Sequence, residues 1–537
     1  MRFTKNFFVA CLLFASTITA CLAQGYKNPV IPGFYPDPSI CRVGNDYYLV
    51  NSSFEYFPGV PVWHSTDMVH WHQIGNVLDR ASQLPLKNCK PSNGIYAPTI
   101  RYHDGVFYMV VTLVSGNMSY GNFYVTATNP AGPWSEPIYV NQSGIDPSLF
   151  WDEDGKMYFI SNRATKSSDP RAIYQSEIDI KTGKRLSDIK ELWKGSGGSY
   201  VESPHMYKKD NYYYLQTAEG GTAYGHSVAI ARSKNIWGPY ESCPHNPILT
   251  NRMAYSQLQG TGHADMIQAT DGSWWMVHLG FRPAVDGIHF IGRETCLTPV
   301  EWPSDEWPTV NGNGQSDIII KKNPPNYQTE TPQPFNATVL TEFDKPLSFE
   351  WLHLRNPDSA NYSLTDRKGY LCLKGSEYSL YDWESPTMIA RRQQHFDFAA
   401  STKIDFNPNK ANEEAGITMM MDNRFHYDFY INTKEGKRQL NLRYTLDSLN
   451  QVMKQIPLTN GDVELMVKGD KKIYTFFYKQ ANGAMVEVGK INTRFLGTEV
   501  SGGYNGVILG LYATGNGQKS TTNAFFDWFK YEPLGKY

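Results

Sequence analysis

The sequence has few charged residues and almost no net charge. Asp, Glu, Lys and Arg make up 19% of the 537 residues, and the formal net charge is -2. Nucleic acids and anionic membrane surfaces attract proteins mainly through clustered positive charge. The composition therefore gives no reason to expect either of these partners.

Cysteine is also scarce, and its spacing excludes two classes of small stabilised domain. Of the 7 cysteines, Cys11 and Cys21 belong to the N-terminal segment. The others are odd in number and form no Cys-x-x-Cys pair, so they predict neither a disulfide framework nor a zinc site. We expect buried free thiols at Cys41, Cys89, Cys243, Cys296 and Cys372.

Long apolar runs are missing except at the N-terminus. Arg2 and Lys5 precede an apolar run from Phe7 to Ala20, and small residues follow it. This order is typical of a secretory signal peptide, and the run is too short for a stable membrane span. We expect a signal peptide over residues 1–23, cleavage after Ala23, and no transmembrane span elsewhere.

The signal segment leaves two locations open. Export to a bacterial periplasm is the first expectation. The stretch Ile18-Thr19-Ala20-Cys21 also resembles a bacterial lipobox, in which Cys21 would carry a lipid. An outer-membrane lipoprotein anchored at Cys21 is therefore the alternative.

Aromatic residues are abundant, at 14% of the chain with 35 tyrosines and 13 tryptophans. Many of them lie in strand-like runs that follow a turn signal, and these units repeat at steps of 50 to 61 residues. Each unit is a type I′-like hairpin signal that feeds an aromatic strand. The units begin at Asp46, Asp104, Asp154, Asp210 and Asp271.

Five units of this length, each with room for four strands, predict a five-bladed β-propeller. The pattern stops beyond Trp307-Pro308, and a proline-rich stretch follows. Strand-like runs separated by Gly-Asp and Asn-Gly turns fill the rest of the chain, which suits a β-sandwich. The predicted all-β domains are a propeller over 24–322, a linker over 323–336 and a sandwich over 337–537.

Three acidic residues lie beside prolines, each just ahead of an aromatic strand. They are Asp37, Asp146 and Glu202, and they fall at the first strands of the first, third and fourth predicted blades. First strands line the central axis of a propeller, so these carboxyl groups are expected to meet in one hollow, near Tyr96 and His263 of the other two blades. Hydrolysis of a glycosidic bond needs such a set: a proton donor, a base and a group that sets the donor's pKa.

The chain resembles glycoside hydrolase family 43, in particular its two-domain β-xylosidases and α-L-arabinofuranosidases. The propeller region carries the resemblance in order, and Trp351–Pro357 and Gly510–Ala513 resemble the family's appended concanavalin-like sandwich. The matching propeller motifs are Phe34–Ser39, Tyr96–Ile100, Ile145–Ser148, Val201–His205, Gly262–Asp265 and Gly292–Thr295.

The resemblance implies a role for each acidic residue. Asp37 would be the general base that activates a water, and Glu202 would be the general acid that protonates the glycosidic oxygen. Asp146 would orient Glu202 and raise its pKa, because nearby negative charge favours the protonated acid. Inversion of the anomeric centre follows if the base and acid carboxyls lie about 6.5–9.5 Å apart.

Four more residues match family positions around the sugar. Arg293 would contact the substrate and the acidic cluster, and Phe54 and Tyr96 would shape the pocket. Tyr96 stands where the family often has tryptophan. His263 lies where the family sometimes holds a largely water-coordinated calcium ion, although calcium prefers oxygen ligands. We expect no required cofactor, with a structural calcium as an alternative.

The expected activity is exo-acting release of terminal α-L-arabinofuranose, β-D-xylose, or both, from hemicellulose-derived oligosaccharides. The two sugars present similarly placed hydroxyls, so the sequence does not separate them. The sandwich is expected to lend a loop that narrows the pocket, which favours chain ends. A catalytically inactive carbohydrate-binding propeller is the alternative. A fructan hydrolase is excluded, because Pro36 and Ile145 stand where that group needs Asn and Arg.

Overall fold

The computed structural model describes residues 25–115, 118–163, 172–481 and 483–535. The predicted signal peptide, with Cys21 and the cleavage position after Ala23, lies outside the described residues. Within these ranges nearly all regular structure is strand, as the all-β prediction requires, and no helix there is long and apolar enough to cross a membrane. The short helical segments are α1 (Thr498–Ser501) and 3-10 turns at Val285–Gly287, Pro334–Asn336, Ser359–Asn361 and Thr493–Leu496.

The first part of the chain folds into five antiparallel sheets of four strands, which follow one another in sequence. The first contains β2 (Ser39–Val43), β3 (Asp46–Val50), β5 (Gly59–Ser65) and β6 (His72–Leu78). The second contains β7 (Gly94–His103), β8 (Val106–Ser115), β9 (Met118–Ala127) and β10 (Ile138–Val140). The third contains β11 (Ile145–Trp151), β12 (Met157–Arg163), β13 (Ala172–Glu177) and β14 (Lys190–Trp193). The fourth contains β15 (Glu202–Lys209), β16 (Tyr212–Glu219), β17 (Ser227–Ser233) and β18 (Glu241–Ser242), and the fifth β19 (Gln259–Gln268), β20 (Trp274–Phe281), β21 (Glu294–Glu301) and β22 (Thr309–Val310).

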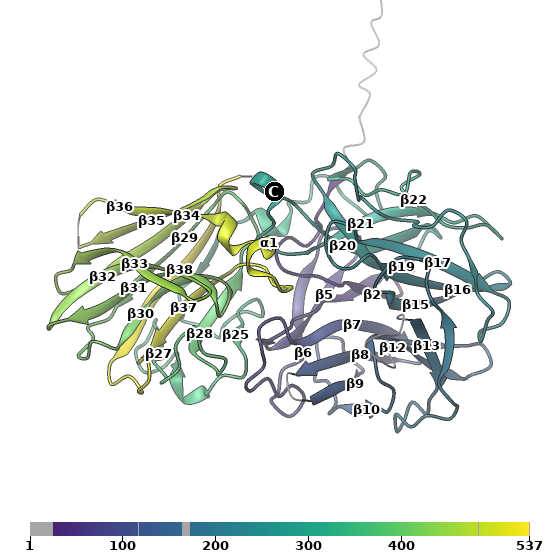
Figure 1. The fold of residues 1–537 in the computed structure, drawn as a ribbon, viewed down its shortest axis with the longest axis horizontal. Helices are drawn as coiled ribbons and strands as arrows, with labels where there is room; N and C mark the ends of the chain where they lie inside the picture. Colours follow the sequence, from purple (N-terminus) through teal and green to yellow (C-terminus); the bar gives the residue numbers. More distant parts are fainter. Residues whose placement is uncertain (1–24, 116–117, 164–171, 482, 536–537) are drawn as a thin grey trace, which may run out of the picture.

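These five sheets form a closed, propeller-like ring (Figure 1). The first strand of each sheet contacts the first strand of the next, in the order β2, β7, β11, β15, β19 and back to β2. A ring of this kind brings residues from all five sheets to one axis. The central hollow expected from the sequence therefore has a structural basis.

The repeated turn signals are the hairpins between the first and second strands of each sheet. Among these five described hairpins, both central residues have positive φ only at Asp104-Gly105, at 47° and 81°. Only this one therefore meets the backbone requirement of a type I′ turn. The repeat predicted the position of every hairpin, but the type I′-like turn expected for each is found only at Asp104-Gly105.

The N-terminal segment closes the ring without a covalent link. Strand β1 (Tyr26–Lys27) pairs with β23 (Ile319–Ile320), which comes after the fifth sheet. Next to it, the Asn28 side chain donates to the Leu297 carbonyl at 2.9 Å and accepts from the Leu297 amide at 2.9 Å. Residues from the two ends of the domain thus share one set of hydrogen bonds.

The second part of the chain is a two-layer sandwich. One layer contains β24 (Val339–Thr341), β26 (Tyr362–Ser363), β27 (Leu371–Lys374), β38 (Asn523–Pro533), β29 (Phe398–Asp405), β34 (Val463–Gly469), β35 (Ile473–Gln480) and β36 (Val486–Asn492). The other contains β28 (Thr387–Arg392), β37 (Ile508–Thr514), β30 (Glu414–Asp422), β31 (Phe425–Lys434), β32 (Lys437–Leu446) and β33 (Leu449–Pro457). The predicted domain boundaries at 322, 336 and 337 stay predictions.

In the six-stranded layer, strands β28, β30 and β37 are buried on both faces. On β30, alternate residues such as Ile417 and Met419 point into the core between the layers, whereas Met420 packs with Phe34, Phe54 and other residues of the propeller. Period-two alternation puts successive side chains on opposite faces. The outer face of this layer is therefore the surface that docks on the propeller.

A short strand pair joins the two domains directly. Strand β4 (Tyr56–Phe57), between the second and third strands of the first sheet, pairs with β25 (His353–Leu354) from the start of the sandwich region. Figure 1 shows β25 at the seam between the sandwich and the ring. This pairing lies beside Phe54, so the domain interface reaches the predicted pocket.

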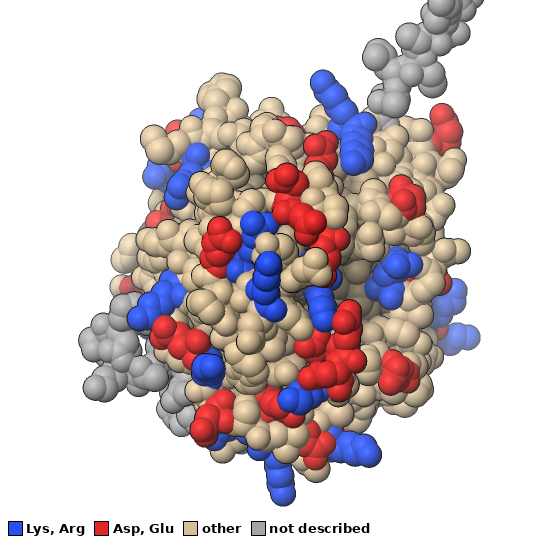
Figure 2. Space-filling view, turned by 90° about the vertical axis from the view of Figure 1, so that its right-hand side faces the viewer, with Lys and Arg blue, Asp and Glu red and all other residues tan. Residues whose placement is uncertain are grey.

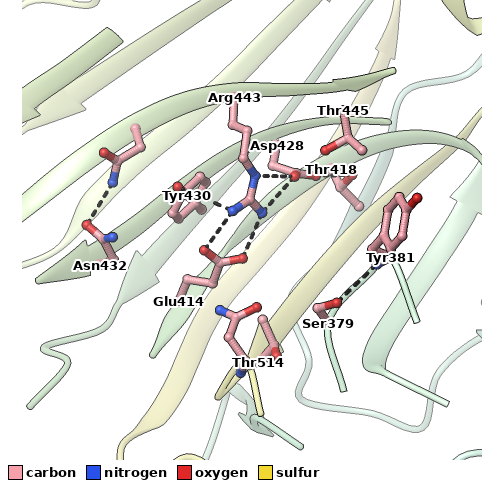
Figure 3. A network of polar contacts seen from close by, with 12 residues as sticks. Ser379, Tyr381, Glu414, Thr418, Asp428, Tyr430, Asn432, Arg443, Thr445 and Thr514 are labelled. Carbon is pink, nitrogen blue, oxygen red and sulfur yellow. Dashed lines mark hydrogen bonds and ion pairs between the residues drawn. The ribbon is translucent and has the colours of Figure 1, made fainter. Parts of the chain in front are cut away.

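An ionic network is buried on the outer face of the same layer (Figure 3). Arg443 donates from Nε to Asp428 at 2.9 Å and from both terminal nitrogens to Glu414, at 2.7 and 3.1 Å. Thr418 donates to the other Asp428 oxygen at 2.8 Å. Burial raises the pKa of Asp428, but the neighbouring His426 and Arg443 outweigh it and hold that pKa well below its usual range.

Replacing Arg443 by methionine is expected to lower the free energy of unfolding by about 3–5 kcal/mol, because it leaves two buried carboxylates without their cation. Urea unfolding, followed by circular dichroism, measures this change. A triple variant that also carries Glu414→Gln and Asp428→Asn should recover much of the loss, since neutral groups carry a smaller burial penalty. Equal unfolding midpoints for Arg443→Met and the parent would contradict this account of the network.

The surface charges are mixed in sign on the side of the ring seen in Figure 2. Lys and Arg side chains alternate there with Asp and Glu, separated by uncharged residues. This face therefore offers no continuous basic surface of the kind that nucleic acids bind. In the interior, the five predicted free thiols are confirmed: Cys41, Cys89, Cys243, Cys296 and Cys372 are all buried and unbridged.

Candidate active site

A cavity of about 600 Å³ lies where the inner strands of the ring meet the sandwich. It is lined by residues from or next to the strands of all five sheets, and by α1 and the loop that follows it in the sandwich. All seven residues that the sequence singled out lie in its wall: Asp37, Phe54, Tyr96, Asp146, Glu202, His263 and Arg293. The predicted convergence of the three acidic side chains is therefore confirmed.

Irregular backbone explains how the inner strands aim these side chains. Asp37, Asp146 and His263 have φ of 55°, 54° and 45°, in the left-handed region that is strained for residues with a side chain. The pairing register also shifts next to Asp146 in β11 and next to Glu202 in β15. A bulge of this kind re-aims a side chain, so carboxyl groups that regular alternation would not align can face one cavity.

Asp37 is held by a cation and a hydroxyl group. Arg293 donates from Nη1 to Asp37 Oδ1 at 3.0 Å, and the Ser52 hydroxyl donates to Oδ2 at 2.6 Å. His263 Nδ1 lies 3.6 Å from the same Oδ1. Both carboxylate oxygens are thereby fixed in position in the cavity wall.

The same surroundings set the charge of Asp37. Burial raises its pKa, but the Arg293 guanidinium and the Ser52 hydrogen bond, with the charge that His263 can carry, outweigh burial, so the pKa is lowered. His226, also in the cavity wall, has its pKa lowered to about 3 by burial. The site near neutral pH thus contains an ionised Asp37 beside a neutral imidazole.

Asp146 and Glu202 come from neighbouring sheets that contact each other through β11 and β15. The backbone amide of Ser203, next to Glu202, donates to Asp146 Oδ2 at 3.2 Å. Asn162 of β12 donates to the carbonyl of Val201, on the other side of Glu202. The third sheet therefore fixes the backbone on both sides of Glu202. Asp146 is buried, whereas Glu202 is partly accessible.

Three aromatic rings form one wall of the cavity. Phe54 contacts Tyr96 at a centroid distance of 5.3 Å and is stacked with Tyr504 at 6.0 Å. The Arg293 guanidinium lies 5.7 Å from the Phe54 ring and 5.8 Å from the Tyr504 ring. A wall of aromatic rings beside a guanidinium can pack against the faces of a sugar while the cation binds its hydroxyls.

Several residues of the wall were not predicted individually. The main ones are Thr222, which accepts from Arg293 Nη1 at 2.9 Å, and Tyr504, whose carbonyl accepts from Nη2 at 3.3 Å. Glu499 of α1 also lines the cavity and contacts His289 Nδ1 at 2.5 Å. The glycine pairs Gly220-Gly221 and Gly502-Gly503 beside Thr222 and Tyr504 are a sequence signal that could have marked these loops. The predicted pocket loop from the sandwich is thus confirmed.

The surroundings of His263 fit a protein-bound calcium ion poorly. Its neighbouring carboxylate is Asp37, whose oxygens already accept from Arg293 and Ser52. Calcium takes six to eight oxygen ligands, and in the described part of the chain no group of three or more His, Cys, Asp and Glu side chains could hold a metal ion. We derive no step of the chemistry through calcium.

Comparison with known families decides what kind of site this is. Residues 26–308 match the description of the glycosyl hydrolases family 43, and residues 341–532 match the β-xylosidase C-terminal concanavalin A-like domain. The chain belongs to glycosyl hydrolase family 43. As a member of this family it is a glycosidase, with the propeller-like catalytic domain and the sandwich that its sequence predicted.

Two curated relatives align over nearly the whole chain. The non-reducing end α-L-arabinofuranosidase BoGH43B of Bacteroides ovatus is 44% identical over 516 residues, 95% of each chain. The xylosidase/arabinosidase of Butyrivibrio fibrisolvens is 39% identical, over 95% of this chain and 99% of its own.

Solved structures of similar proteins share the same fold. The protein described as Bacteroides ovatus Xyloglucan PUL GH43B has a TM-score of 0.89 at 43% identity, covering 95% of this chain and 100% of its own. The xylan β-1,4-xylosidase from Bacillus halodurans has a TM-score of 0.89 at 34% identity, covering 94% of this chain and 100% of its own. The arrangement of the ring and the sandwich relative to each other is therefore the same in these two structures as in this protein.

Proposed function

We propose that this protein is an exo-acting, inverting glycosidase that releases a terminal pentose from hemicellulose-derived oligosaccharides. The observation that carries this proposal is one cavity that collects Asp146 of β11, Glu202 of β15 and Asp37, which lies just before β2 of the first sheet. An acid, a base and a third carboxyl around one sugar-sized space form the set that glycoside hydrolysis uses.

In this mechanism Asp37 is the general base. Its lowered pKa keeps it ionised, and Arg293 and Ser52 fix its orientation. It accepts a proton from a water molecule that attacks the anomeric carbon from the face opposite the leaving group. Because water is the nucleophile, no covalent sugar–enzyme bond forms and the configuration at this carbon inverts.

Glu202 is the general acid, and Asp146 is the neighbouring carboxyl group that stays ionised. Glu202 is partly accessible, so it can reach a glycosidic oxygen in the cavity. Asp146 accepts from the Ser203 amide and thus lies beside the backbone of Glu202. A negative charge there favours the protonated form of Glu202, which is the form that must donate to the leaving group.

The shape of the cavity supports action on chain ends. Its wall combines the inner strands of the ring with Thr498, Glu499, Gly503 and Tyr504 from the sandwich. A pocket closed by a second domain on one side accepts a terminal sugar more readily than the middle of a polymer. The sandwich thereby acts as part of the specificity pocket.

Terminal α-L-arabinofuranose is our first candidate and β-D-xylose the second. The relative at 44% identity is named for arabinofuranose, and the one at 39% identity for both sugars. Hydrolysis of nitrophenyl α-L-arabinofuranoside and β-D-xyloside, together with arabinoxylan, arabinan and xyloglucan fragments, tests this. Release of terminal pentose supports the proposal. Binding of these sugars without hydrolysis would show the alternative, an inactive carbohydrate-binding propeller.

Replacing Arg293 by methionine is expected to move the acid limb of the kcat/KM profile to higher pH. Burial raises the pKa of Asp37, and Arg293 is the strongest of the influences that lower it. Without the guanidinium the Asp37 pKa rises, so more of the base is protonated at a given acidic pH. The profile is measured on an activated aryl glycoside. An acid limb at the same pH in the variant and the parent would contradict this prediction: either Asp37 is not the general base, or Arg293 does not lower its pKa.

We also propose export, supported by the signal-like order of Arg2, Lys5 and the apolar run that follows them. Cell fractionation of the full chain tests for a periplasmic product. Labelling with a radioactive fatty acid, in the parent and in Cys21→Ala, tests the lipid anchor. Label that depends on Cys21 would favour the lipoprotein over the cleaved soluble form.

A further inference from the structure

Glu55 is a fully buried carboxyl group directly behind the aromatic wall of the cavity. It follows Phe54 in sequence, but it does not line the cavity itself. Its two oxygens bind two different segments of the protein. Oε2 accepts from the backbone amide of Ser92 at 3.1 Å, and Oε1 accepts from the side-chain nitrogen of Asn505 at 2.7 Å. Ser92 belongs to the ring and Asn505 to the sandwich.

Ser92 passes this connection on to two rings of the wall. Its hydroxyl oxygen accepts from the backbone amide of Tyr504 at 2.9 Å, and its carbonyl accepts from the Tyr96 hydroxyl at 2.9 Å. Tyr96 and Tyr504 contact each other at a centroid distance of 6.1 Å and both contact Phe54. One short segment thus positions rings from two domains.

The sandwich loop is closely fitted to this segment. Gly503 has φ of 78°, and a Cβ atom added to it would lie 2.5 Å from the Ser92 hydroxyl oxygen. On the ring side, a Cβ added to Gly94 would lie 2.1 Å from the Phe54 carbonyl oxygen. A neighbouring group can approach the backbone this closely only where the residue is glycine. The loop around Tyr504 therefore has little freedom to shift while these contacts hold.

The chemistry of the two partners favours a carboxylate between them. The Ser92 amide and the Asn505 side-chain nitrogen both donate, and a carboxylate is the side chain that accepts on both oxygens without carrying a hydrogen. Burial raises the pKa of Glu55 to about 7, with the nearby Arg355 guanidinium and these two donors acting against it. Arg355, from the sandwich side of the interface, also donates its backbone amide to the Glu55 carbonyl at 2.8 Å.

We propose that Glu55 is a positioning residue that fixes the sandwich loop around Tyr504 to the ring segment around Ser92, and so sets the shape of the sugar pocket. Glu55 acts through Tyr96 and Tyr504 and does not touch the substrate. Its role in specificity rests on the proposed glycosidase function. Its role in holding the loop does not, because the contacts exist without substrate.

Two single variants test the loop contact. Glu55→Gln places an amide group against one of the two donors, and Asn505→Asp places a second carboxylate against Glu55. Each is expected to raise KM for the nitrophenyl glycoside about tenfold while kcat changes less than about threefold, as loss of ground-state binding predicts. Unchanged KM in both correctly folded variants would overturn the proposal.

The double variant Glu55→Gln with Asn505→Asp exchanges donor and acceptor. The amide nitrogen introduced at position 55 can then donate to the carboxylate introduced at position 505, while the amide oxygen accepts from Ser92. We expect KM to return most of the way to the parent value. If each substitution only weakened the fold, the two increases in KM would add in the double variant and would not cancel. A KM in the double variant higher than in either single variant would therefore overturn the proposal.

Gly503→Ala displaces the same loop without changing Glu55, and it should raise KM in the same way. Asn356→Ala is the matched control. Asn356 also joins the two domains, accepting from the Leu86 amide at 2.6 Å and donating to the Leu84 carbonyl at 2.9 Å, but it lies outside the cavity wall. It should leave KM unchanged. Equal effects of Asn356→Ala and Glu55→Gln would assign the result to general weakening of the interface.

Hydrogen–deuterium exchange separates this inference from the proposed function. The amides of Ser92 and Tyr504 both donate within the network, so Glu55→Gln should make peptides that contain them exchange faster, with no substrate present. Peptides from β30 should be unchanged. If exchange becomes faster in Glu55→Gln but the parent protein is inactive, the loop contact is supported and the proposed function is contradicted. If exchange is unchanged in Glu55→Gln and the parent protein is active, only the proposed role of Glu55 is contradicted.

Discussion

Asp37→Asn is expected to lower kcat by about 10²–10⁴-fold on every substrate, whatever its leaving group. The amide keeps the size of the side chain and one acceptor oxygen, but it cannot take a proton from water. Activation of water is needed for all substrates in an inverting mechanism, so an activated aryl glycoside should suffer as much as an oligosaccharide. Steady-state kinetics on both substrates measures the effect.

The control for Asp37→Asn tests whether the sugar pocket is still intact in the variant. Binding of the free sugar product, by calorimetry, should stay within a few-fold of the parent, since Arg293 and Ser52 remain. Ser52→Ala is a matched variant that removes one hydrogen bond to the carboxylate and keeps the base. It should lose far less activity than Asp37→Asn. Full activity of folded Asp37→Asn would exclude Asp37 as the base.

Glu202→Gln is expected to separate substrates by their leaving group. A natural sugar alcohol needs a proton to depart, so kcat on oligosaccharides should fall by about 10²–10⁴-fold. A dinitrophenolate departs without protonation, so a dinitrophenyl glycoside should lose less than about tenfold. The alkaline limb of the pH profile should also disappear on the activated substrate, because that limb reports the loss of the acid's proton.

The matched comparison for Glu202→Gln is Asp37→Asn on the same two substrates. The acid variant should discriminate between them, and the base variant should not. Equal activity of Glu202→Gln and the parent on natural oligosaccharides would remove Glu202 from the acid role. An equal loss on both substrates would instead point to damage of the pocket.

The parts of the site that the sequence predicted are those with a local signal. Asp37 and Asp146 each precede a proline, Glu202 lies two before one, and the turn-plus-strand repeat places them at inner strands. The repeated units predicted the ring of five sheets, and the ring predicted that the three carboxyl groups meet in one cavity. No long-range information was needed for this step, because a propeller brings first strands together whatever lies between them.

The parts that the sequence missed depend on contacts between distant segments. Tyr504 lies in the stretch Ser501–Gly506, which reads as an ordinary glycine-rich turn. Its place in the cavity comes from docking of the sandwich on the ring. Glu55 looks like one polar residue in an aromatic loop, and only the structure shows its contacts to Ser92 and Asn505. The left-handed backbone of Asp37 and Asp146 likewise has no pattern in the sequence.

The most direct test of the mechanism is the configuration of the first sugar released. Proton NMR during early hydrolysis of an α-L-arabinofuranoside or a β-D-xyloside resolves the two anomers before they interconvert. A water activated by Asp37 on the face opposite the leaving group predicts the inverted anomer: β from the arabinofuranoside and α from the xyloside. A product that keeps the configuration of the substrate would contradict the mechanism.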